Sequence, residues 1–154
     1  MKKIITIFTA VLLIAAMLTA CGGSKAADLK TVMNDINSQF GLTGLKTLES
    51  TDDLNRYYMI NADDVKQFAA ELSTTASQYT EVVLVEANDQ TAAGSIKTQL
   101  EAHLGTQLNT AKSYDAAQVA MIEACSVKQS GNYVYLVVSD KFGDITSAIE
   151  AALK

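Results

Sequence analysis

Two side chains in this chain of 154 residues are of the types that most often act as a nucleophile or a base, namely Cys125 and His103, the only histidine. Cys125 lies in the segment IEACSVKQ, whose apolar residues alternate, so we predict a small, buried hydrophobic side chain. His103 lies near Leu100 and Leu104, at the edge of an apolar helix face. This position favours packing at the core boundary over a role as a ligand or base. The patterns GxSxG, HExxH, GxGxxG and the phosphate-binding loop are absent. We therefore identify no catalytic residue, no cofactor and no metal site.

The second cysteine, Cys21, ends a different kind of segment. Lys2 and Lys3 precede an uncharged, apolar stretch over residues 4–17, and small residues follow it. This is the pattern of a secretory signal, and the stretch is shorter than the ~20 residues that span a bilayer. The ending LTAC resembles the lipobox of bacterial lipoproteins. That resemblance implies cleavage between Ala20 and Cys21 and a diacylglyceryl group on Cys21, and two acyl chains suffice for stable anchoring.

These assignments divide the chain into three parts. Residues 1–20 form the lipoprotein signal peptide, residues 21–27 the lipidated cysteine and a short tether, and residues 28–154 one globular domain. Loss of residues 1–20 leaves ten Lys and Arg against seventeen Asp and Glu, which disfavours nucleic acid as a partner. We expect the protein at the cell membrane, lipid-anchored and facing the extracytoplasmic side.

Acidic and aromatic pairs are the remaining candidates for a site. The pairs Asp52–Asp53 and Asp63–Asp64 lack the spacing of a calcium loop, so charges at helix starts are the better interpretation. Asp140 and Asp144 resemble a turn into a helix. The chain has no tryptophan, which argues against a carbohydrate-stacking module, although its six tyrosines keep that option open.

The tyrosines supply a possible binding surface. Tyr57 and Tyr58 are adjacent and cannot both point inward, so at least one of them should be partly exposed. Tyr133 and Tyr135 would share one strand face. We name these four residues as a possible binding surface, but favour packing at the rim of the core.

Hydrophobic periodicity predicts the elements that must position these residues. Apolar residues at helical spacing start at Asp28 and stop at Gly41, a favourable residue for ending a helix. A short helix that carries Leu54, Tyr57 and Tyr58 is predicted, with Thr51 or Asp52 as its cap. Further helices are predicted from the pair at 88–89, which offers an N-cap, to about Lys112, from Asp115 to Ala120, and over about 144–153.

Strands are predicted over 81–87, 122–129 and 133–139, with Gly131 and Asn132 connecting the last two as a hairpin. Residues 64–75 fit a helix through Val65, Phe68, Ala69 and Leu72, and fit a strand through alternate residues. Periodicity alone does not decide between them.

The strings EVVLVEANDQTAAGSIKTQLEAHLGTQL and SYDAAQVAMIEACSVKQSGNYVYLVVSD are similar to a family of small Gram-positive lipoproteins built on a domain of unknown function. The resemblance covers most of residues 28–154. It implies an α+β fold, with a small antiparallel sheet packed against a long amphipathic helix and against N- and C-terminal helices. It also favours a strand over 66–75, and it carries no known activity.

Three functions stay open at this point. The first is a non-catalytic, membrane-anchored module that binds an unknown protein or small molecule at the cell surface. The second is an envelope enzyme, which would need a cleft with polar side chains of perturbed pKa near His103 or Cys125. The third is a structural component of a membrane-associated complex.

Overall fold

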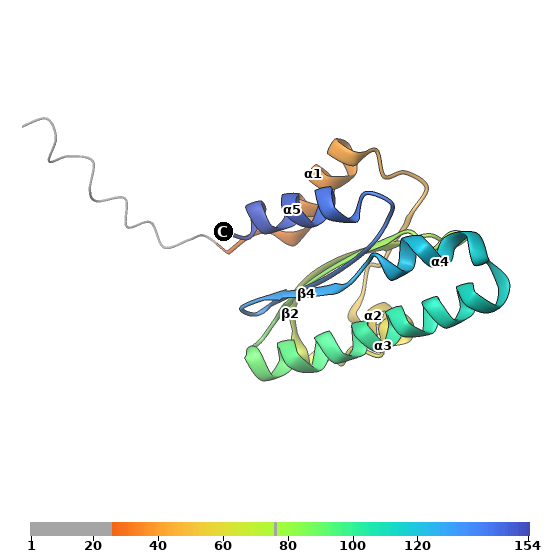
Figure 1. Ribbon diagram of the computed structural model, residues 1–154. Helices are drawn as coiled ribbons and strands as arrows, with labels where there is room; N and C mark the ends of the chain where they lie inside the picture. Colours follow the sequence, from red (N-terminus) through yellow and green to blue (C-terminus); the bar gives the residue numbers. More distant parts are fainter. Residues whose placement is uncertain (1–25, 76) are drawn as a thin grey trace, which may run out of the picture.

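The protein is a three-layered α+β domain in the computed structural model, which describes residues 26–75 and 77–154. Two helices cover one face of a central antiparallel sheet, and the other helices cover the opposite face (Figure 1). The predicted fold class is confirmed.

The sheet has the strand order β1-β2-β3-β5-β4. Its strands are β1 (Lys46–Thr47), β2 (Val65–Leu72), β3 (Glu81–Ala87), β4 (Val127–Ser130) and β5 (Tyr133–Val138). All neighbours are antiparallel, and β3 pairs with β5 from Glu81 opposite Val138 to Glu86 opposite Tyr133. Every residue of β3 is buried, because β3 has a strand on each side and helices over both faces.

The helices of the described residues are α1 (Leu29–Phe40), α2 (Thr51–Tyr58), α3 (Gln90–Tyr114), α4 (Ala116–Glu123) and α5 (Phe142–Ala152), with a 3₁₀ turn η1 (Ala62–Asp64). Helices α1 and α5 pack on the even-numbered side chains of β3, including Val82 and Leu84. Helices α2, α3 and α4 pack on the odd-numbered ones, including Val83 and Val85. The period of two along the strand thus divides the core into two layers.

Helix ends follow the capping residues of the sequence. The Asp28 carboxylate accepts from the backbone N–H of Lys30 at 2.9 Å, and Gly41 ends α1 at φ 67°. Of the two residues of the predicted cap at 88–89, Asp89 caps α3. The cap of α2 is Ser50 rather than Thr51 or Asp52, because its hydroxyl accepts from the backbone N–H of Asp53 at 3.2 Å.

The predicted strand over 122–129 is wrong in its first half. Residues up to Glu123 continue α4, and β4 begins only at Val127. The alanine-rich run from 116 to 124 favours helix, and Ile122 meets the core from the helix rather than from the sheet. The other boundaries shift by a few residues: α3 reaches Tyr114, and α5 begins at Phe142.

The ambiguous segment 64–75 is a strand from Val65 to Leu72. Pairing with β3 along almost its whole length overrides the competing helical period, with one irregularity in register between Val65 and Gln67. The strand indicated by the family resemblance is confirmed.

Within residues 26–75 and 77–154, no helix combines the length and the apolar character needed to cross a membrane. The first described residues lie beside the C-terminal end of α5, at one end of the domain (Figure 1). Ala27 and Leu153 pack against the same core cluster. The chain therefore enters and leaves the fold at the same end.

Candidate functional site

A buried carboxylate joins three elements on the α2–α3 side of the sheet. Glu81, the first residue of β3, is 1% exposed. The Tyr58 hydroxyl, from the end of α2, donates to Glu81 Oε2 at 2.9 Å. His103 Nε2, from α3, lies 3.1 Å from Glu81 Oε1 and 3.2 Å from Oε2. The Tyr58 and His103 rings meet edge to face at 4.6 Å. We call these three residues the Glu81 cluster.

The electrostatics of the Glu81 cluster follow from its burial. Desolvation, and then the Glu81 carboxylate beside it, raise the pKa of Tyr58, so its hydroxyl stays protonated and donates. A buried carboxylate is stabilised only when donors face its oxygens, and Tyr58 and His103 provide them. A histidine next to a carboxylate can serve as a general base, but here the Nε2 atom of that histidine already faces the carboxylate.

The sequence places His103 correctly at the boundary of the core, since its side chain is 20% exposed. It gives no sign of the Glu81 cluster as a whole. One signal was present: an acid opens the strand EVVLVEA, whose other residues are mostly apolar. An acid in a strand that is buried on both faces needs a partner from a neighbouring element.

Cys125 is the small, buried side chain that the sequence predicts. Its thiol donates to the carbonyl of Met121 at 3.2 Å, and the residue is 7% exposed. Burial, and to a smaller degree the charge of Glu81, raise the pKa of Cys125. The side chain is therefore a neutral thiol near neutral pH.

The four tyrosines do not form one surface. Tyr58 and Tyr135 are buried, at 1% and 3% exposure, which removes them from the possible binding surface. Tyr57 and Tyr133 are partly exposed, as predicted for one member of the first pair, but they pack against opposite faces of the sheet. Tyr133 and Tyr135 do share a strand face, and burial with the neighbouring Glu150 raises the pKa of Tyr135 to about 12.

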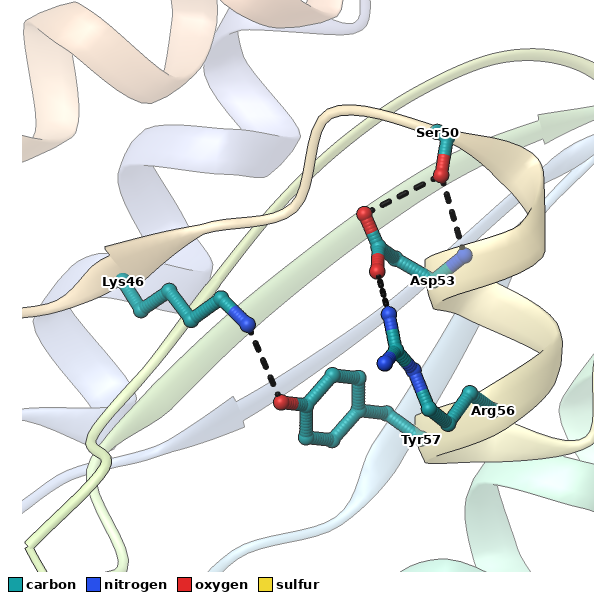
Figure 2. Close-up of polar contacts among 5 residues, drawn as sticks. All are labelled: Lys46, Ser50, Asp53, Arg56 and Tyr57. Carbon is teal, nitrogen blue, oxygen red and sulfur yellow. Dashed lines mark hydrogen bonds and ion pairs between the residues drawn. The ribbon is translucent and has the colours of Figure 1, made fainter.

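Tyr57 is the tyrosine with a polar environment at the surface. Figure 2 shows its ring close to Lys46 and Arg56, and the Lys46 ammonium donates to the Tyr57 hydroxyl at 3.1 Å. The Lys46 nitrogen lies 5.2 Å from the ring centre, within the range of a cation–π contact. Arg56 pairs with Asp53, whose pKa is lowered first by the Ser50 hydroxyl and then by Arg56. These contacts attach β1 to α2.

The acidic pairs lie at element starts, as the sequence predicts. Asp52 and Asp53 occupy the first turn of α2, and Asp63 and Asp64 lie in η1. Asp144 is in the first turn of α5. In the part of the chain that the structure describes, no three His, Cys, Asp or Glu side chains gather closely enough to hold a metal ion.

Cys21 and Ala20, the residues of the expected lipidation and cleavage site, lie outside the described residues. The nearest described part is the start of α1, which is fixed to the sheet by Gln67. This side chain accepts from the Leu29 N–H at 3.1 Å and donates to the Ala27 carbonyl at 2.8 Å. The position at which the chain enters the domain is thus well defined.

Comparison with known protein families gives a match. No curated protein and no solved structure matches the chain. The family described as Domain of unknown function (DUF4358) matches residues 38–139, more than half of the 154 residues. The matched region starts inside α1 and ends just after β5, so it includes the whole sheet and the Glu81 cluster. The chain belongs to the DUF4358 family.

Proposed function

We propose that the protein is a lipid-anchored, extracytoplasmic binding module, held to the cell membrane by a diacylglyceryl group on Cys21. The observation that carries this proposal is the sequence LTAC at the end of a short apolar segment that Lys2 and Lys3 precede. A thiol is a good nucleophile for alkylation, and small residues before it suit a peptidase.

The short tether adds to this proposal. Six residues separate Cys21 from Asp28, which caps α1. Six residues of chain reach at most about 20–22 Å, whatever conformation they adopt. The domain would therefore lie next to the bilayer, with the Ala27 end nearest to it.

A binding role is favoured over an enzymatic one by the state of the two reactive side chains. Cys125 is a buried thiol with a raised pKa, and the His103 nitrogen that faces Glu81 is engaged with that carboxylate at the core boundary. Cys125 does line a hollow of about 330 Å³ between α3 and α4, but its thiol donates to the Met121 carbonyl, and His103 is not among the residues that line this hollow.

The test is membrane fractionation of the full chain and of Cys21→Ser in the cell of origin, with metabolic labelling by a radioactive fatty acid. The wild type should sediment with membranes and carry the label. Cys21→Ser should lose the label and either appear in the medium or keep its uncut precursor length. Cys125→Ser is the matched control and should behave as the wild type. A Cys21→Ser protein that still carries label and stays with the membrane would contradict the proposal.

A further inference from the structure

A cleft of about 350 Å³ opens at one end of the domain. Four segments that are distant in sequence form it: the end of α1 with the loop that follows, the residues just before β3, one residue of α4, and the turn after β5. A site built by loops and helix ends on a rigid sheet is a common arrangement for binding. Its volume is at the lower end of the range for small-molecule sites, about 300–1,000 Å³.

The cleft lies at the end of the domain opposite the tether. Gln67 holds Ala27 at one end of the sheet, where Glu86 pairs with Tyr133. Helix α1 then runs for 12 residues, or roughly 18 Å, along the sheet. At its far end, the Lys141 ammonium donates to the carbonyl of Phe40 at 2.9 Å. In a protein anchored at Cys21, the cleft would therefore lie at the end of the domain far from the anchor.

The lining is mostly neutral and able to form hydrogen bonds. Its uncharged polar side chains are Thr43, Gln78, Tyr79, Thr80, Gln118 and Ser139. Hydroxyls and side-chain amides both donate and accept hydrogen bonds, so they match ligand hydroxyls in either direction.

The charged groups of the cleft balance each other. One acid, Asp140, and one base, Lys141, line it. Asp140 already accepts from the Ser139 hydroxyl at 3.2 Å, and Lys141 already donates to Phe40. Such a lining offers little to a strongly charged ligand, since no excess of one sign faces the cleft.

Phe40 and Tyr79 supply apolar ring surface in the same cleft, and both are partly exposed. Aromatic faces pack against C–H groups, and Tyr can add a hydrogen bond at the edge of such a contact. The chain has no tryptophan, so these two rings are the aromatic surface available at this site.

We propose that this cleft binds a neutral, polyhydroxylated ligand, that is, a short segment of carbohydrate outside the cell. Its hydroxyls would bond to Gln78, Thr80 and Gln118, and a C–H face would pack on Tyr79. The proposal deepens the proposed function, because it rests on a binding module whose cleft lies at the end far from the membrane anchor.

The test uses the full chain in mild detergent, fluorescently labelled, on an array that displays neutral glycans, anionic glycans and peptides. The wild type should be retained on neutral glycans. Gln78→Ala and Tyr79→Ala should each weaken retention by about tenfold or more. The matched controls are Gln129→Ala and Tyr114→Ala, because both residues are exposed and lie outside the cleft. Both controls should bind as the wild type does.

Several results would overturn the assignment: no retention on any neutral glycan, retention on anionic glycans or peptides alone, or equal retention by all four variants. Circular dichroism of each variant checks that it is folded, and the exposed Gln78 is the safer of the two cleft positions. Retention on the array does not require a lipid on Cys21. A failed array thus leaves the fractionation result standing, and a soluble Cys21 protein leaves the array result standing.

Discussion

The two ends of the central strand β3 each hold a buried acid, and the two acids have different kinds of partner. Glu81, at the end near the cleft, faces the α2–α3 layer, where a tyrosine and a histidine meet it. Glu86, at the end near the tether, faces the other layer and pairs with the Lys66 ammonium at 2.6 Å and with the Gln67 amide. Glu81 is 1% exposed and Glu86 is 5% exposed.

The partners explain the difference between the two ends. The Lys66 side chain is 55% exposed, so water still reaches that ion pair from one side. In the Glu81 cluster, the histidine side chain is 20% exposed and the Glu81 side chain 1%. Glu81 thus depends almost wholly on protein partners, whereas Glu86 shares its charge with a solvated cation. The two acids lie on one strand, five residues apart in sequence, and face opposite layers because of the strand's period of two.

The largest expected effect comes from removing the acid at the cleft end. Glu81→Ala leaves a buried tyrosine hydroxyl and a histidine nitrogen without their acceptor, so we expect a loss of about 3 kcal/mol in the free energy of unfolding. Urea unfolding followed by circular dichroism measures it. Glu81→Gln is the matched control, because its amide oxygen still accepts a hydrogen bond, and it should lose less. A Glu81→Ala protein as stable as the wild type would remove the distinction between the two ends.

A smaller effect is expected at the tether end. Glu86→Ala breaks the bonds from Lys66 and Gln67, but the ammonium returns to water, so we expect a loss of about 1–2 kcal/mol in the same measurement. Gln67 keeps its bonds to Ala27 and Leu29, and α1 should stay docked. Lys66→Ala, which leaves the Gln67 bond in place, should cost less than Glu86→Ala. The comparison fails if Glu86→Ala destabilises the protein more than Glu81→Ala does.

The pH dependence of the free energy of unfolding tests whether the charge of Glu86 stabilises the fold. Burial raises the pKa of Glu86, but the bonds from Gln67 and Lys66 outweigh it, so that the net pKa is lowered. A carboxyl with a lower pKa in the folded state stabilises the protein above its unfolded pKa of about 4.3, and loses that contribution as the pH falls through the folded value.

The stability difference between the wild type and Glu86→Gln should accordingly be largest near about pH 6 and should shrink towards about pH 3. Urea unfolding at a series of pH values measures this difference. A difference that is constant over the whole range would show that the ion pair contributes nothing through its charge.

The smallest effect concerns Cys125 near the cleft end. In a Cys21→Ser background, where Cys125 is the only thiol, a disulfide reagent should label the native protein on the order of 100-fold more slowly than the unfolded protein. Since the Glu81 charge contributes to the raised pKa of Cys125, Glu81→Gln should lower that pKa slightly and speed native labelling. Fast labelling of the native wild type would instead make Cys125 a reactive thiol, and would revive the enzymatic alternative.

Local patterns predict much of this fold from the sequence. Asp28 and Gly41 define α1 through capping chemistry, and the β-branched runs define β3 and β5. The strand predicted from Ile122 failed because alternation and helical spacing overlap in a short apolar run, and the alanines beside it favour helix. For the same reason, periodicity does not decide between helix and strand for residues 64–75. The pairing of β2 with β3 decides it.

The Glu81 cluster and the cleft could not be predicted in this way. Tyr58 and His103 are 23 and 22 residues away from Glu81 in sequence, and only the packing of α2 and α3 on β3 brings them together. The cleft needs four segments whose relative positions depend on the whole topology. Such juxtapositions leave no local signal beyond an acid in an apolar strand.

The first and last described residues lie at the same end of the domain, and this has a consequence for rearranging the chain. Because the start of α1 lies beside the end of α5, a short glycine and serine linker could join them with little loop-closure entropy. A circular permutant opened at Asp115, between α3 and α4, would keep every strand pairing of the sheet. The order in which the helices and strands are synthesised is then separable from the architecture that they form.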